Sequence, residues 1–317
     1  VVRVSSPDGN LVVTVNIKNG VPSYSATLFN KTVIEHSALG LKTSVGNFTQ
    51  GLQLLNHETT AIHEKYQMRG TKASSNDYQA NRLTVNLQDH DGLDFDIIFQ
   101  VSNNDIAFKY AIPRQKYSGK EFKRALVYHE ASAFNFPDGT KTFLSPQIGP
   151  ETGWEQTKPS YEEVYGADQP MDAKSRYDHG YVFPALFHLP NGWALVSETG
   201  VGGNYCGSHL SDYVKGRGYT IAYPDKGENN GFGSEYPAIP LPGETPWRTI
   251  TVGGGLRPIM ETTISYDLVK PRYEASTEYK PGRYTWSWLI GQDNSINYED
   301  QVRFIDLASA MGFEYCL

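Results

Sequence analysis

The sequence predicts a mainly β protein, in which a large antiparallel β-sandwich is followed by a linker and one βαβ unit. Two observations support this prediction. From residue 1 to about 266, apolar and polar side chains alternate with a period of two, as they do in half-buried strands. After residue 280, the pattern changes to strand, helix and strand. We therefore expect a sandwich at 1–266, a linker at 267–280 and a βαβ segment at 281–317.

The strands of the sandwich follow one another through short turns. In segment 11–18 every odd position is apolar, which places one face on a core and the other in water. Further strands are predicted at 21–29, 32–34, 83–87, 93–101, 106–112, 124–129, 193–198, 219–223 and 247–253. So many strands exceed one small sandwich and favour a large two-sheet sandwich, because stacking the sheets hides their apolar faces.

Two long segments interrupt the alternation. Segment 145–184 is acidic and keeps aromatic residues, which is typical of a binding loop rather than a disordered segment. Its residues Trp154 and Tyr161 are candidates for stacking on a sugar ring, and anchoring the loop is an equal alternative on composition alone. Segment 224–243 has fewer aromatic residues and is predicted to be an ordinary long connection.

The C-terminal segment has the signals of a βαβ unit. A strand is predicted at 284–289 and a loop at 291–296. Asn297 caps a helix with Asp300 three residues later, Gly312 ends it, and 313–317 forms a second strand. Because one βαβ unit cannot cover its own apolar faces, we expect the sequence to end within a domain and 281–317 to be unstable alone.

Composition and motifs exclude several classes of protein. The net charge of −7 disfavours nucleic acid and anionic membrane surfaces as partners, and the sequence contains no apolar run long enough for a membrane span. Only two cysteines occur, Cys206 and Cys316, far apart in the sequence, which is not the pattern of a disulfide framework or a cysteine zinc site. The histidines have no paired metal-ligand spacing, and the patterns of nucleotide-binding loops and serine-hydrolase elbows are absent.

Glu198 is the carboxylate that the pattern singles out. It shares the parity of Ala194 and Val196 at the end of an apolar strand, so it is predicted to face the core side. A charge in that place needs a partner, because isolated burial costs several kcal/mol. Calcium is one such partner. The alternative is an exposed or arginine-paired glutamate at a strand end.

Several motifs in the same order resemble glycoside hydrolase family 97, a bacterial family of α-glucosidases and α-galactosidases. They are Ser6-Pro7-Asp8-Gly9, Ser37-Ala38-Leu39-Gly40-Leu41, Tyr161-Glu162-Glu163-Val164-Tyr165, Gly192-Trp193-Ala194-Leu195-Val196-Ser197-Glu198, Thr245-Pro246-Trp247-Arg248 and Lys280-Pro281-Gly282-Arg283. The resemblance implies an N-terminal β-super-sandwich, a linker and a (β/α)8 barrel. Segment 281–317 would then be the first βαβ unit of a barrel that is incomplete in this sequence.

The resemblance also implies an activity, which is exo-acting hydrolysis of α-glycosidic bonds in oligosaccharides with one calcium ion. Glu198 matches a glutamate of the N-terminal domain that reaches the calcium, which is shared with the missing barrel. Trp288, at the end of the first barrel strand, matches a pocket aromatic residue. Trp154, Tyr161 and Glu162 are expected to contact substrate from the sandwich. The short loop at 291–296 favours the retaining α-galactosidase-like branch.

The catalytic carboxylates of the family lie on later barrel strands, so no catalytic residue is expected in this chain. Alone it is expected to be inactive, and its partner is the remainder of the barrel. The family implies a periplasmic or other extracytoplasmic location, with a signal peptide that this sequence does not contain. The alternative is a non-catalytic carbohydrate-binding or structural sandwich. Sequence that continues beyond Leu317 with further βα units would favour the enzyme.

Overall fold

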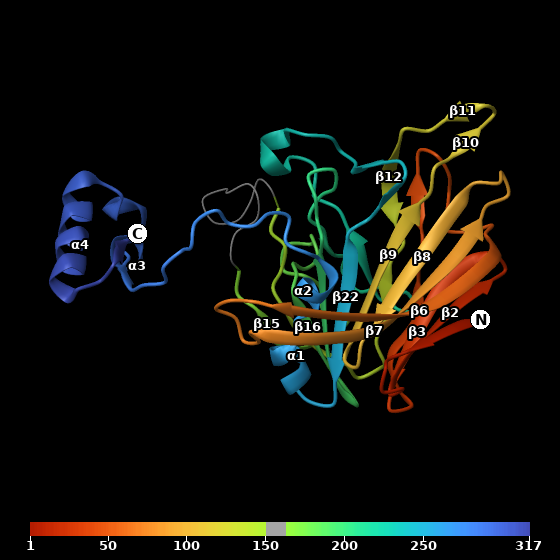
Figure 1. The fold of residues 1–317 in the computed structure, drawn as a ribbon, viewed down its shortest axis with the longest axis horizontal. Helices are drawn as coiled ribbons and strands as arrows, with labels where there is room; N and C mark the ends of the chain where they lie inside the picture. Colours follow the sequence, from red (N-terminus) through yellow and green to blue (C-terminus); the bar gives the residue numbers. More distant parts are fainter. Residues whose placement is uncertain (150–162) are drawn as a thin grey trace. The chain divides into compact units, whose positions relative to one another are not determined.

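The computed structural model describes residues 1–149 and 163–317 (Figure 1). By its internal contacts the chain divides into two compact units, Val1–Lys270 and Pro271–Leu317. Within the described ranges, no helix has the length and apolar character needed to cross a membrane.

A ten-stranded antiparallel sheet forms the main layer of the first unit (Figure 1). Its order is β15 (Gly166–Pro170), β14 (Lys141–Leu144), β16 (Ala185–Leu189), β17 (Gly192–Thr199), β22 (Trp247–Gly253), β9 (Asp105–Ile112), β8 (Asp94–Val101), β7 (Ser75–Gln88) and β6 (Gln53–Gln67), with β21 (Gly243–Glu244) also paired to β9. The predicted alternation sets the register: Phe99 of β8 lies opposite Phe108 of β9, and both are fully buried.

Smaller antiparallel sheets cover the inner face of the main sheet. They are β1 (Val2–Ser5), β2 (Leu11–Lys18), β3 (Val21–Leu28) and β4 (Lys31–Ala38); β20 (Ala238–Pro240), β12 (Arg124–Glu130) and β5 (Leu41–Thr43); and β13 (Ala133–Phe134), β19 (Tyr219–Ala222) and β18 (His209–Leu210). A separate hairpin, β10 (Lys116–Tyr117) and β11 (Lys120–Glu121), is mostly exposed. Aromatic rings join the layers: Tyr24 packs on Phe99 at 5.5 Å and Phe136 on Phe187 at 4.2 Å between ring centroids. Most of the buried apolar side chains form one continuous core between the layers, and the predicted antiparallel sandwich is confirmed.

Two strands of the main sheet give little signal in the sequence. β6 lies at the sheet edge and is mostly exposed, so its side chains carry no alternating apolar face. It is a strand because its backbone pairs with β7 along its length. β15, within the segment predicted as a loop at 145–184, is likewise an exposed edge strand that pairs with β14.

β22 is buried on both faces, since all of its residues are buried. Two short helices, α1 (Arg257–Glu261) and α2 (Ile264–Leu268), follow it and pack on the outer face of the sheet. There Trp247 contacts the cluster of Ala107 and Ile264, whereas the alternate positions Ile250 and Val252 belong to the sandwich core.

The second unit is a short βαβ segment. It consists of β23 (Tyr284–Thr285), α3 (Trp288–Gly291), the 3₁₀ turn η3 (Gln292–Ser295), α4 (Tyr298–Met311) and β24 (Tyr315–Cys316). β23 and β24 pair in parallel. The predicted helix ends are confirmed: Asn297 accepts a hydrogen bond from the Asp300 amide at 2.9 Å, and Gly312 ends α4 in the left-handed conformation at φ 65°.

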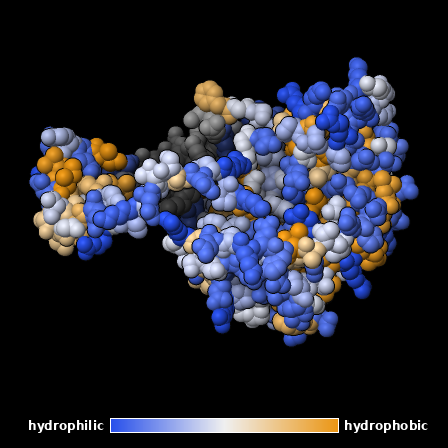
Figure 2. Space-filling view, viewed as in Figure 1, coloured by the Kyte–Doolittle hydropathy of each residue, from blue (hydrophilic) through white to orange (hydrophobic). Residues whose placement is uncertain are grey.

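The predicted strand at 284–289 is wrong in its second half. β23 ends at Thr285, and the Gly291 amide donates to the Ser287 carbonyl at 3.0 Å, which turns Trp288 into the first residue of α3. Figure 2 shows apolar side chains gathered on the surface of this unit. The exposed apolar side chains of this unit include Leu289, Ile290, Ile296, Tyr298, Val302, Ile305, Leu307 and Met311. Such a surface is typical of a contact with further protein.

Candidate functional site

Arg248 is the most unusual residue of the sandwich core. It lies on β22 with the same parity as Ile250 and Val252, so its side chain enters the core, and none of its surface is exposed. Its guanidinium group stays charged, because the carboxylates around it raise its pKa although burial alone would lower it. A buried guanidinium needs several hydrogen-bond acceptors, and two carboxylates supply them.

The first carboxylate is Glu130, on the opposite layer of the sandwich. Arg248 Nε donates to Glu130 Oε1 at 2.8 Å and Arg248 Nη2 donates to Oε2 at 2.7 Å, so the pair is bidentate. Glu130 faces inward because a β-bulge between Val127 and His129 shifts the inward parity of β12 by one residue. The pair therefore joins the two layers across the core.

The second carboxylate is Glu198, directly opposite Arg248 in the pairing of β17 with β22. Arg248 Nη1 donates to Glu198 Oε2, which also accepts from Ser208 Oγ at 2.5 Å, while Oε1 accepts from the Ser208 amide at 2.9 Å. The Glu198 side chain is 13% exposed. We call Arg248, Glu130 and Glu198 the arginine clamp. Its formal charge is −1, from two carboxylates and one guanidinium.

The clamp holds Glu130 in its ionised form. Burial alone would raise the pKa of this carboxyl, but the charge and hydrogen bonds of Arg248, with smaller contributions from Ser132 and Tyr205, hold the pKa below its usual range. Ser132 Oγ donates to Glu130 Oε1 at 2.8 Å, and Tyr205 Oη donates to Oε2 at 3.3 Å. Tyr205 Oη in turn lies 2.8 Å from Tyr223 Oη.

A cleft of about 1220 Å³ opens beside the clamp. Its walls are residues 128–130 at the end of β12, the loop 203–206 and the segments 221–228 and 231–238, which contain part of the 3₁₀ turn η2 (Glu228–Gly231). Segment 224–243 thus lines a cleft, where the sequence predicted only a connection. Burial raises the pKa of the Cys206 thiol in this wall to about 12, so it stays protonated and is no nucleophile at neutral pH.

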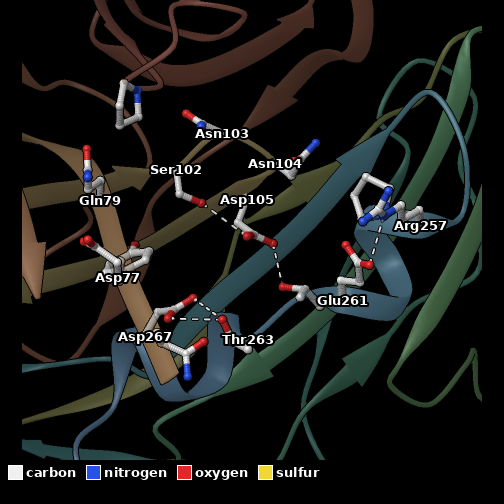
Figure 3. Close-up of a pocket in the computed structure, with 15 residues that line it drawn as sticks. Asp77, Gln79, Ser102, Asn103, Asn104, Asp105, Arg257, Glu261, Thr263 and Asp267 are labelled. Atoms are coloured by element: carbon white, nitrogen blue, oxygen red, sulfur yellow. Dashed lines mark hydrogen bonds and ion pairs between the residues drawn. The ribbon is translucent and has the colours of Figure 1, made fainter. Parts of the chain in front are cut away.

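A second, polar pocket of about 560 Å³ lies beside helices α1 and α2 (Figure 3). Asp105 accepts hydrogen bonds from Thr251 at 2.5 Å and Thr262 at 2.9 Å, and Asp267 accepts from Tyr66 at 2.5 Å. Burial raises the pKa of both carboxyls, that of Asp267 to about 6. Because these carboxylates are satisfied by protein hydroxyl groups, they attach the α1–α2 segment to the sheet.

The predicted site residues fall in three places. Glu198 is in the arginine clamp. Trp154, Tyr161 and Glu162 lie outside the described residues. Trp288 lies in the second unit, where its Nε1 donates to Asp293 at 3.0 Å and its ring stacks on Trp286 at 5.8 Å, so the prediction that it ends a strand is wrong.

Sequence reasoning did not predict four residues of this site: Arg248, Glu130, Tyr205 and Tyr223. One signal could have indicated the clamp: Arg248 occupies an inward position of an apolar strand, and such a position requires an acidic partner. No sequence pattern identifies that partner.

The residues around Glu198 do not by themselves fit a calcium site. Calcium takes about 6–8 oxygen ligands, and here a guanidinium occupies Oε2, leaving only Oε1 with spare acceptor capacity. Among the residues that the structure describes, the group of acids and histidine close enough to share a metal is Asp89, His90 and Asp91, which does not include Glu198.

Comparison with known proteins assigns the sandwich first to a class: it is the N-terminal domain of a glycoside hydrolase. The model of the family described as Glycosyl-hydrolase 97 N-terminal matches residues 4–271. The chain therefore belongs to glycoside hydrolase family 97, and the predicted resemblance is confirmed.

Three known proteins are similar to this chain. The crystal structure of a beta-arabinopyranosidase matches 99% of this chain at 50% identity with a TM-score of 0.93. A probable retaining alpha-galactosidase of Streptomyces bingchenggensis is 26% identical over 90% of the chain. A family 97 enzyme of Pseudoalteromonas sp. strain K8, solved in complex with panose, shares the fold over 99% of the chain at 21% identity and a TM-score of 0.79. The chain covers 50%, 40% and 46% of these proteins, respectively.

Proposed function

We propose that this chain is the N-terminal portion of an exo-acting glycoside hydrolase that cleaves pyranosides with the ring configuration of galactose. The observation that carries the proposal is the 50% identity, over 99% of the chain, to a beta-arabinopyranosidase. The probable retaining alpha-galactosidase supports the same choice of substrate, although at lower identity.

The two substrates named for these relatives are chemically close. In the L series, arabinopyranose has the same arrangement of ring hydroxyls as D-galactopyranose and lacks only the exocyclic hydroxymethyl group. Its β-linkage corresponds to the α-linkage of D-galactose, because the reference carbon of the anomeric label differs between the two sugars. One pocket shape can therefore accept both, and the axial 4-hydroxyl distinguishes them from glucosides. We propose galactose-configured α-glycosides, including β-arabinopyranosides, as the substrate class.

We propose that the sandwich serves this activity as a rigid support. The arginine clamp joins β17 and β22 to β12 through a buried bidentate pair, which fixes the strand end that carries Glu198. A calcium ion in the complete enzyme would receive at most one oxygen from this unit, Glu198 Oε1, and its other ligands would come from elsewhere in the enzyme. The catalytic acid and the base or nucleophile are likewise proposed to lie outside this chain.

The complete enzyme tests the proposal. We expect it to hydrolyse p-nitrophenyl α-D-galactopyranoside and β-L-arabinopyranoside faster than the α-D-glucopyranoside. On oligosaccharides we expect it to release one sugar at a time from the non-reducing end. We expect the 317-residue chain to hydrolyse none of them, since the catalytic carboxylates are proposed to lie elsewhere. Preference for the glucoside would contradict the substrate class. Absence of hydrolysis by the complete protein would favour the alternative, a non-catalytic carbohydrate-binding or structural sandwich.

A further inference from the structure

The cleft beside the arginine clamp contains a hydrogen-bond chain whose direction is fixed. Tyr205 Oη lies 3.3 Å from Glu130 Oε2 and 2.8 Å from Tyr223 Oη. Because Arg248 keeps Glu130 ionised, its oxygens only accept hydrogen bonds. Tyr205 must therefore donate its proton to Glu130, and Tyr223 must donate its proton to Tyr205.

This direction leaves an acceptor on the oxygen of Tyr223, which is one of the residues that line the cleft. A phenol has one proton, and that of Tyr223 is used in the bond to Tyr205. Among the side chains that the structure describes, which do not include those of residues 229 and 230, Tyr223 Oη has no second hydrogen-bond partner. A ligand that donates a hydroxyl proton would complete the chain, whereas a ligand that only accepts would not.

Two further aromatic side chains, those of Tyr128 and Tyr236, also line the cleft. Tyr128 and Tyr236 pack edge to face, with ring centroids 5.1 Å apart and an interplanar angle of 83°, and Tyr128 is 41% exposed. Of the 23 lining residues that the structure describes, five are tyrosine or phenylalanine. A sugar ring has an apolar C–H face and polar hydroxyl edges, so it matches an aromatic wall next to a hydroxyl acceptor.

The charged residues of the lining select against anions. Glu130, Asp225, Glu228 and Glu235 are acidic, and Lys226 is the one lysine or arginine among the lining residues that the structure describes. A phosphorylated or carboxylated ligand would meet a net negative wall, whereas a neutral sugar pays no such electrostatic cost.

We propose that this cleft binds a neutral pyranose ring, with one ring hydroxyl donating to Tyr223 Oη and the C–H face of the sugar against the Tyr128–Tyr236 pair. The choice of galactose-configured sugars rests on the proposed function. The site itself rests on the tyrosine chain and the aromatic wall.

Titration of the 317-residue chain with D-galactose, L-arabinose and inorganic phosphate, followed by saturation-transfer NMR, tests the site. We expect saturable binding of the sugars and none of phosphate. Tyr223→Phe keeps the ring but removes the acceptor, so it should weaken sugar binding about two- to tenfold, the effect of one net hydrogen bond. Tyr213→Phe is the matched control, since Tyr213 packs on Tyr219 at 5.6 Å and does not line the cleft.

A second variant, Tyr236→Ala, removes the wall without touching the hydrogen-bond chain and should also weaken binding. Circular dichroism shows whether each variant is folded. Absence of saturable sugar binding by the unaltered chain would overturn the proposal, as would equal effects of Tyr223→Phe and Tyr213→Phe or equal binding of phosphate. If the complete enzyme hydrolyses galactosides while the chain binds no sugar, the cleft proposal fails and the proposed function stands. If the chain binds sugar but the complete protein hydrolyses no glycoside, the proposed function fails and the cleft proposal stands.

Discussion

Replacing Arg248 by methionine should destabilise the sandwich strongly. Met fills much of the same space but leaves Glu130, which is 1% exposed, with only the Ser132 and Tyr205 hydroxyl groups as donors. Removing one partner of a buried ion pair typically costs about 3–5 kcal/mol in the free energy of unfolding. For a domain of this size each kcal/mol lowers the melting temperature by about 2–4 °C, so we expect a decrease of about 6–20 °C.

The pH dependence separates loss of the ion pair from loss of packing. In the unaltered chain the pKa of Glu130 is lowered, so its contribution to stability is present above the usual pKa and is lost as the pH falls through the folded-state value. In Arg248→Met the positive charge that lowers the pKa of Glu130 is gone, so burial should raise the pKa of Glu130 above its usual value. Charge on Glu130 would then oppose folding, and the variant should recover stability as the pH falls.

Thermal unfolding followed by circular dichroism across acidic and neutral pH measures both effects. Arg114→Met is a matched control, because Arg114 pairs with Glu121 at 2.6 Å on the surface and such pairs contribute about 0–1 kcal/mol. The double variant Glu130→Gln with Arg248→Met should unfold at a higher temperature than Arg248→Met alone, since the buried charge is gone. A melting temperature of Arg248→Met close to that of the control, or an unchanged pH dependence, would refute this account of the clamp.

Three further predictions concern calcium, pH and the second unit. By isothermal titration calorimetry the 317-residue chain should bind Ca²⁺ weakly or not at all, because Glu198 is its single proposed ligand. In the complete enzyme Glu198→Gln should lower both the calcium affinity and the rate of hydrolysis. Unchanged values of both would mean that Glu198 has a purely structural role. Because the pKa of Asp267 is raised in the folded chain, the stabilisation that this carboxyl contributes is fully present below its usual pKa of 3.8. That contribution is lost as the pH rises through about 6. Asp267→Asn should flatten that part of the profile of melting temperature against pH, and an unaltered slope would show that another group causes it. An isolated 281–317 peptide should be unfolded by circular dichroism, since α4 leaves its apolar side chains uncovered, whereas 1–270 should melt cooperatively; a folded monomeric peptide would contradict this.

The sequence by itself determined the features that depend on near neighbours. The period-two alternation of β8 and β9 predicted their strands, and Asn297, Asp300 and Gly312 predicted both ends of α4, because these signals act over a few residues. The order of short motifs along the chain was enough to predict the family. The strand β6 was not predicted, because an exposed edge strand needs no alternating apolar face.

Only the tertiary structure decided the partners of the buried charges. Arg248 and Glu130 are 118 residues apart in the chain, and no local pattern links them. The bulge in β12 turns Glu130 inward, where uninterrupted alternation would have placed His129 with Ala125 and Val127. The identity of the residue that meets Arg248 thus depends on strand register and layer packing, which are set when distant segments fold together. For the same reason segment 224–243 reads as a connection in the sequence and lines a cleft in the folded chain.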